Sequence, residues 1–294
     1  MDELDFSAPK PAQAGQPSKP VAPSAPDILY DPNVAYAFFR NGGKEELIEG
    51  GKFIFEENQK GGGLFGKADR MYLLVEGLVG LMAKGEFLTV LRPGDIFGEM
   101  AVVAGLPRTA TAKAQTACKL VSLDNKAFLG ALAKAPEFAL MLMSMMVNRL
   151  RALMAKPGGV TSNEAPSESS AVFDKKLMTE LHKLLADRPP MEVPPQKAVI
   201  AAGAAGTMMY VLLEGSVDIV VGTTVVERIG AGGLFGEMAL VDRSARAASA
   251  IAQTDCKLLP LNRNDFLALV RTNPAFGASL LKAIAVRTSA LVKK

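Results

Sequence analysis

The chain contains two copies of one segment, and this internal repeat limits what it can fold into more than any other feature. A shift of 138 positions aligns Met71–Met154 with Met209–Val292 without a gap, and 31 of the 84 aligned pairs are identical. The sequences MYLLVEG, DIFGEMA and AQTACKL of the first copy return as MYVLLEG, GLFGEMA and AQTDCKL in the second. Because a repeat of this length holds a complete structural unit, the sequence predicts two domains of the same fold.

Two stretches without core-forming residues mark the limits of these domains. Residues 1–30 are rich in Pro and Ala and are predicted to form a disordered tail. Residues 157–172, PGGVTSNEAPSESSAV, combine glycine, proline and small polar residues and are predicted to form a flexible linker. The predicted domains are therefore residues 31–156 and 173–294.

Within each copy, short apolar runs with a period of mostly two alternate with glycine-rich turns, which is typical of β-strands. Val217–Val221 and Thr224–Ile229 are examples. A longer segment with apolar residues at helical spacing ends each copy. A helix over Phe173–Asp187 is predicted to open the second copy, because the pair Pro189-Pro190 follows it. The predicted fold class is mainly β with flanking helices.

Charge and composition exclude several classes of protein. The 33 Lys and Arg residues oppose 30 Asp and Glu residues, and a net charge of +3 is too small to form a surface that follows nucleic acid. The most apolar run, Phe138–Val147, has ten residues, about half of what a membrane-spanning helix needs. The acidic start, MDELDF, differs from a secretory signal. We therefore expect a cytoplasmic protein without membrane insertion.

The strongest functional pattern is Phe-Gly-Glu-Met-Ala, followed nine residues after the Glu by an Arg and small residues. A glycine lets a ligand approach the backbone, and a following helical turn offers free N–H groups to an anion. Arginine adds a planar set of donors for phosphate, whereas a carboxylate accepts hydrogen bonds from hydroxyls. The pattern therefore indicates a ligand that carries a sugar and a phosphate. The candidate residues are Gly98, Glu99, Met100, Ala101, Arg108, Thr109 and Ala110 in the first copy, and Gly236, Glu237, Met238, Ala239, Arg246, Ala247 and Ala248 in the second.

An ordinary ion pair between the Glu and the Arg is the structural alternative. A buried ion pair is weak evidence for stability, because desolvation of the charges offsets their attraction. The same spacing in both copies, flanked by small residues that leave room for a ligand, favours binding.

The sequence F-G-E-M-A followed by R-T-A or R-A-A, with M-Y-x-L-x-E-G upstream and a trailing helix, resembles the phosphate-binding cassette of the cyclic nucleotide-binding domain family. That family includes the catabolite activator protein and cyclic nucleotide-dependent protein kinases. The resemblance covers about residues 34–156 and 173–294, and it implies two tandem β-roll domains of jelly-roll type. It implies that Glu99 and Glu237 accept the ribose 2′-hydroxyl, and that Arg108 and Arg246 bind the cyclic phosphate.

The resemblance implies cAMP as the ligand, with cGMP as the alternative. In the kinase branch of the family, Thr or Ser directly after the arginine tends to accompany cGMP and Ala tends to accompany cAMP, so Thr109 and Ala247 split this preference between the two copies. It also implies a sensor that passes its signal to an unidentified effector protein. No other cofactor, no metal and no enzymatic activity are expected, since no nucleophile with a base partner is visible and His182 is the only histidine.

Three further expectations concern partners. No helix–turn–helix follows either copy, so we expect no DNA binding. The tandem layout resembles a kinase regulatory subunit, but the first arginine is Arg40, which leaves no Arg-rich pseudosubstrate before it. A ligand-free interaction scaffold with the same fold is the rival hypothesis.

Two features of the first copy leave alternatives open. The path from Asn58 to Met71 is longer than its counterpart in the second copy, and it is either a flap over a pocket or a neutral insertion. The Met-rich helical segment over residues 138–154 is more apolar than one barrel contact needs, which predicts an interface. That interface lies either between the two domains or in a homodimer.

Overall fold

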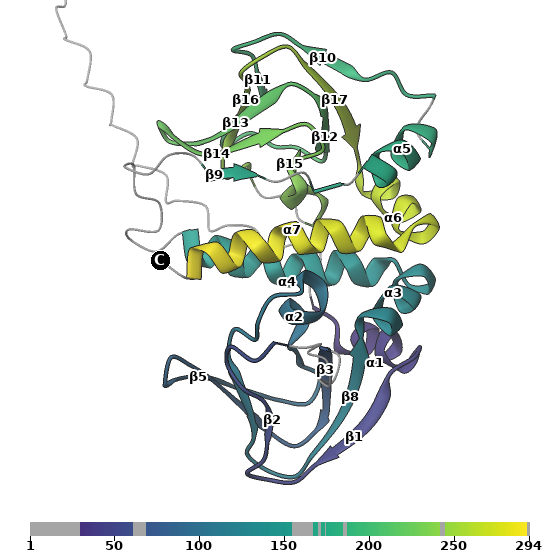
Figure 1. Ribbon diagram of the computed structural model, residues 1–294, viewed down its shortest axis with the longest axis vertical. Helices are drawn as coiled ribbons and strands as arrows, with labels where there is room; N and C mark the ends of the chain where they lie inside the picture. Colours follow the sequence, from purple (N-terminus) through teal and green to yellow (C-terminus); the bar gives the residue numbers. More distant parts are fainter. Residues whose placement is uncertain are drawn as a thin grey trace, which may run out of the picture.

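The structure, a computed structural model, describes residues 30–60, 69–154, 167–169, 172–173, 175–184, 187–241 and 245–292. The predicted tail up to residue 29, most of the predicted linker and residues 61–68 of the first-copy insertion lie outside the described residues. Figure 1 shows two β-rich domains at opposite ends of the molecule, with helices between them.

The first domain contains two four-stranded antiparallel sheets, in the orders β1-β8-β3-β6 and β2-β7-β4-β5. Between them lies an apolar core that includes Phe55, Leu74 and Leu120. This arrangement agrees with the predicted β-roll. The elements are α1 (Pro32–Arg40), β1 (Lys44–Ile48), β2 (Phe53–Phe55), β3 (Arg70–Glu76), β4 (Val79–Ala83), β5 (Glu86–Leu91), β6 (Ile96–Phe97), α2 (Glu99–Ala104), β7 (Thr111–Ala114), β8 (Cys118–Asp124), α3 (Asn125–Lys134) and α4 (Glu137–Met154).

The second domain repeats this topology, with sheets in the orders β10-β17-β12-β15 and β11-β16-β13-β14-β9. The short helix after the cassette glycine is a 3₁₀ turn here, η1, where the first domain has the α-helix α2. The elements are β9 (Ser167–Ser169), α5 (Lys175–Leu184), β10 (Met191–Val193), β11 (Ala198–Ile200), β12 (Met209–Glu214), β13 (Ser216–Val221), β14 (Thr224–Gly230), β15 (Leu234–Phe235), η1 (Glu237–Leu240), β16 (Ser249–Ala252), β17 (Cys256–Leu261), α6 (Arg263–Thr272) and α7 (Pro274–Val292).

Two predictions differ from the structure at the start of the second domain. Ser167–Ser169, inside the predicted flexible linker, forms β9 and pairs in parallel with β14. The helix that was predicted over Phe173–Asp187 is shorter in the structure, where α5 spans Lys175–Leu184. Phe173 lies before this helix, and its ring stacks on Phe276 of α7 at a centroid distance of 4.9 Å. Packing of this aromatic side chain, rather than helix propensity, therefore holds the residue in place.

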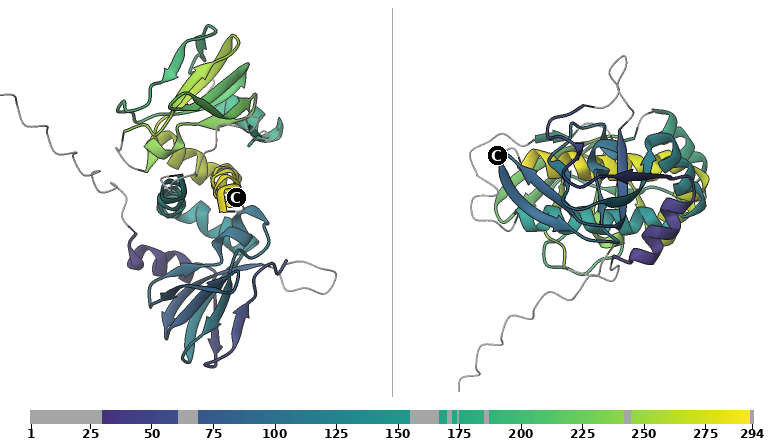
Figure 2. Two further views of the ribbon diagram at one scale, coloured as in Figure 1. Left: turned by 90° about the vertical axis from the view of Figure 1, so that its left-hand side faces the viewer. Right: turned by 90° about the horizontal axis from the view of Figure 1, so that it is seen from below.

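The trailing helices α4 and α7 lie side by side between the two barrels (Figures 1 and 2). They belong to one apolar core that includes Leu142 and Met146 of α4 and Leu280 and Ile284 of α7. Burial of this apolar surface favours a fixed arrangement of the domains. The apolar face of the Met-rich helix is thus covered within the chain, as the interdomain alternative requires, and the homodimer stays a prediction.

Among the described residues, no single helix is long and apolar enough to cross a membrane. One helix pair, α3 with the first part of α4, passes the same test only when the two are taken together, and it is bent by 118°.

Candidate ligand site

Each cassette begins at a glycine whose backbone other residues rarely adopt. Gly98 has φ 75° and Gly236 has φ 78°, and each precedes the first residue of a short helix. A Cβ on Gly98 would lie 2.7 Å from Nη1 of Arg108 and 3.1 Å from the carbonyl oxygen of Arg70. The left-handed backbone and the close approach both require glycine. The first N–H groups of an α-helix have no acceptor within the helix, whereas in η1 the N–H of Ala239 donates to the carbonyl oxygen of Gly236 at 3.2 Å.

Arg108 lies in the first cassette with only 6 % of its surface exposed. Its Nη1 donates a hydrogen bond of 2.9 Å to the carbonyl oxygen of Gly98, and its Nη2 lies 3.6 Å from Oδ1 of Asp69. Burial lowers the pKa of Arg108, while Tyr72, Asp69 and Glu99 act in the opposite direction. A guanidinium stays protonated in such a setting, so the first cassette holds a buried positive charge.

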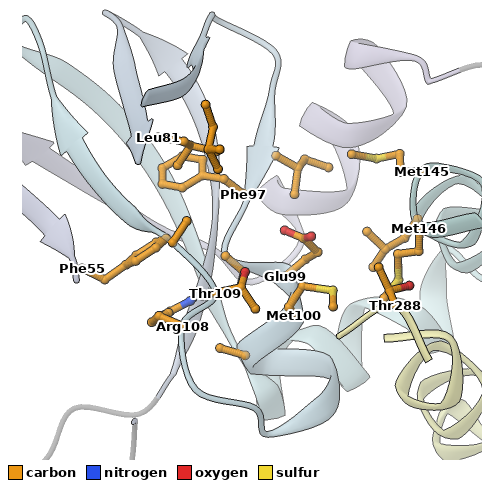
Figure 3. A pocket seen from close by; sticks show the side chains of 16 residues that line it. Phe55, Leu81, Phe97, Glu99, Met100, Arg108, Thr109, Met145, Met146 and Thr288 are labelled. Atoms are coloured by element: carbon orange, nitrogen blue, oxygen red, sulfur yellow. Dashed lines mark hydrogen bonds between the residues drawn. The ribbon is translucent and has the colours of Figure 1, made fainter. Parts of the chain in front are cut away.

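A cavity of about 180 Å³ opens at this cassette. All seven residues predicted for the first site line it, which brings Gly98, Glu99 and Arg108 to its polar end. Figure 3 shows Arg108 and Phe55 on one side of the cavity, and Met145, Met146 and Thr288 on the other. The remaining lining residues are Leu81, Leu88, Ile96, Phe97 and Leu142. The cavity therefore combines a polar end suited to a phosphate and a sugar with apolar walls suited to a flat ring.

One wall of this cavity comes from outside the first barrel. Leu142, Met145 and Met146 belong to α4, whereas Thr288 belongs to α7 of the second domain. Helix α2 of the cassette also contacts α7 directly. The first site is therefore closed by both domains, which the sequence analysis did not predict.

The second cassette keeps the arginine but surrounds it differently. Nη1 of Arg246 donates to the carbonyl oxygen of Gly236 at 2.9 Å, and Nη2 donates to the carbonyl oxygen of Met208 at 2.6 Å. Burial lowers the pKa of Arg246, and Tyr210 and Glu237 oppose this shift. The repeat places Thr207 where the first copy has Asp69. Arg246 is thus held mainly by backbone carbonyls.

The remaining predicted residues of the second site lie around this arginine. Met238 and Ala239 are half-buried in η1, Ala247 is exposed, and Ala248 is half-buried. The structure thus brings the cassette glycine, glutamate and arginine together in both domains, while the ligand-binding role of these residues stays a prediction. Within the described ranges, no group of three His, Cys, Asp or Glu side chains is placed to hold a metal ion.

Glu237 is engaged by an arginine that the sequence analysis missed. Nη1 of Arg287, on α7, lies 3.0 Å from Oε1 of Glu237, and its Nε lies 3.2 Å from Oε1 of Glu227. Its Nη2 donates to the carbonyl oxygen of Leu234 at 3.1 Å. Burial acts to lower the pKa of Arg287, but the two carboxylates raise it overall. The sequence contained a signal for Arg287, because the 138-residue shift aligns it with Arg149, an identical residue in the first copy.

The model of the cyclic nucleotide-binding domain family matches the chain twice, at residues 46–135 and 190–273. These matches cover more than half of the chain and contain both cassettes, so the chain belongs to this family.

Among curated proteins, the chain is similar to cAMP-dependent protein kinase regulatory subunits. It is 30 % identical to that of Aspergillus fumigatus over 190 residues, which are 63 % of this chain and 41 % of that protein. It is 32 % identical to that of Aspergillus niger over 182 residues, which are 60 % of this chain and 39 % of that protein. The chain thus spans less than half the length of these relatives.

The chain is also similar to solved structures. A structure described as cAMP-bound PfPKA-R is 24 % identical, with a TM-score of 0.31, and the match covers 78 % of this chain and 74 % of that chain. The catabolite activator protein of Thermus thermophilus is 27 % identical, with a TM-score of 0.36, over 42 % of this chain and 56 % of that chain.

Proposed function

We propose that this protein is a cyclic nucleotide sensor that binds cAMP in its two cassettes. The observation that carries this proposal is the first-domain cavity, where a buried arginine, a glutamate and the first turn of a helix meet at one end. Charge-assisted hydrogen bonds from Arg108 suit a cyclic phosphate, and Glu99 suits a ribose hydroxyl. The likeness to cAMP-dependent kinase regulatory subunits supports cAMP over cGMP.

The signal passes through the trailing helices to an effector protein. Helix α2 contacts α7, and α7 carries Arg287, which pairs with Glu237 of the other cassette. A ligand that draws α2 or Glu237 toward itself changes the position that α7 prefers, and a helix with two positions can transmit binding energy. The likeness to regulatory subunits makes a protein kinase the class of effector to test first. The protein itself is proposed to have no catalytic activity.

Isothermal titration calorimetry with cAMP and then cGMP tests the binding function. The chain is first unfolded and refolded to remove nucleotide that was carried through purification. We expect saturable binding of cAMP, with weaker binding at one site in Arg108→Ala and at the other in Arg246→Ala. Absence of binding for both nucleotides contradicts the proposal.

The ligand-free scaffold remains a second candidate for the second domain. The pair between Arg287 and Glu237 favours it, because this glutamate already has a partner within the chain. Saturable binding that involves the first cassette alone would support a scaffold role for the second domain.

A further inference from the structure

The two cassettes differ in the side chain that lies beside the cassette glycine, where the arginine also lies. In the first domain, Cζ of Arg108 lies 4.1 Å from the centroid of the Phe55 ring. In the second domain, a Cβ on Gly236 would meet Cδ1 of Ile200 at 2.9 Å, and a Cβ on Gly98 would meet Cε1 of Phe55 at 3.2 Å. Phe55 and Ile200 thus occupy equivalent places, at the ends of β2 and β11. Only the first of the two sites offers an aromatic ring at this place.

The ring of Phe55 is held in position by two other rings. Its centroid lies 6.0 Å from that of Tyr72 and 5.9 Å from that of Phe97. Phe55 is only 7 % exposed, so it has little freedom to turn away. Figure 3 shows Phe55 above Arg108, at the edge of the cavity. A guanidinium within about 6 Å of an aromatic ring is attracted to its face, and the attraction grows when water is excluded.

Among the described residues, the hydrogen bonds of Arg108 leave most of its N–H groups available. In the described part of the chain, Nη1 donates to Gly98, and Asp69 lies beside Nη2 at ion-pair distance. Stacking on Phe55 uses the face of the guanidinium rather than its N–H groups. An arginine held by its face keeps its in-plane donors for a ligand and loses less side-chain entropy on binding.

We propose that Phe55 is a positioning residue for Arg108. Because of this positioning, the first site binds an anionic phosphate with higher affinity than the second site. The proposal rests on the proposed function. Phe55 also lines the cavity, but the role proposed for it acts through the arginine.

The test replaces the ring by the residue that the second domain uses. In an Arg246→Ala background, which isolates the first site, Phe55→Ile is expected to weaken cAMP binding about five- to tenfold. Phe55→Tyr keeps the ring and is expected to retain the affinity within about twofold, whereas Phe55→Leu should resemble Phe55→Ile. The matched variant in an Arg108→Ala background is Ile200→Phe, which is expected to tighten the second site.

A measurement without ligand separates positioning from a general packing role. The Arg108 Nε–H resonance in the NMR spectrum should carry an upfield ring-current shift, and this shift should disappear in Phe55→Ile and persist in Phe55→Tyr. Thermal unfolding of each variant verifies that the fold is retained. Affinity that is unchanged in Phe55→Ile while the parent chain binds cAMP overturns the inference alone. Lack of cAMP and cGMP binding by the parent chain overturns the proposed function and, with it, the role given to Phe55.

Discussion

Nη1 of Arg287 lies 3.0 Å from Oε1 of Glu237, and this pair joins the last helix of the chain to the cassette of the second domain. The Glu237 side chain is 7 % exposed and that of Arg287 is 18 % exposed, so both charges are largely withdrawn from water. Removal of one partner from such a pair leaves the other charge buried without compensation. The position of α7 and the state of the second cassette are therefore linked.

The first prediction concerns this pair. Arg287→Met is expected to lower the free energy of unfolding by about 3 kcal/mol, because Glu237 and Glu227 lose their common cation. The double variant Arg287→Met with Glu237→Gln should recover part of this loss, since it leaves one fewer buried charge. Urea denaturation of the parent and the two variants measures both effects. Equal stability of the single and double variants would show that the charge of Glu237 is not buried.

The sequence predicted the duplication because two long segments of the chain match each other. It predicted the β-rich fold and the composition of both cassettes because these depend on residues close together in the chain. The left-handed turn at Gly98 and the nearby Arg108 follow from one short motif. The roles of Phe55, Thr288 and Arg287 did not follow from it. Strands β3 to β6 separate Phe55 from Arg108 in the chain. Thr288 belongs to the second domain but lines the cavity of the first. Such contacts depend on how helices and barrels pack, which a single sequence does not encode in a local pattern.

The second prediction concerns the cassette glycine. Gly98→Ala is expected to weaken cyclic nucleotide binding at the first site and to cost about 1–3 kcal/mol of stability. Its Cβ would strain a backbone at φ 75° and would press on Arg108 and on the backbone of residue 70. Gly105→Ala is the matched control, because Gly105 has φ 64° with no atom within 4 Å of an added Cβ. The control should lose stability but keep the affinity. Calorimetric titration and urea denaturation of both variants make the comparison.

The third prediction concerns the phosphate-binding arginines. Arg108→Ala should raise the Kd of the first site. The expected loss of binding free energy is about 1.5–3 kcal/mol, which is the usual contribution of a charge-assisted hydrogen bond. Arg92→Ala removes an exposed arginine outside the cavity and should bind like the parent chain. Titration calorimetry with cAMP distinguishes the two. If both variants bind equally well, the cassette does not bind phosphate through this residue.

The fourth prediction concerns pH. Hydrogen bonds from Arg188 lower the pKa of Asp265, partial burial opposes this shift, and the backbone N–H of Asn262 lowers the pKa further. Because the folded pKa lies below the unfolded value of about 3.9, this carboxylate contributes stability above that value. The contribution is lost as the pH falls through the folded pKa. Asp265→Asn should therefore flatten the acid limb of a stability profile below about pH 5, and an unchanged slope there would contradict the assignment.

The fifth prediction concerns the shared core between α4 and α7. Leu280 is fully buried in a cluster that contains residues of both domains, including Met146 and Leu142. Leu280→Ala is expected to lower the free energy of unfolding by about 2–5 kcal/mol, through lost burial and the cavity it leaves.

Because the core is common to both domains, the parent chain should unfold in one transition when followed by Tyr fluorescence and by circular dichroism. Two separate transitions in the parent chain would show that the domains fold independently and that α7 does not couple them.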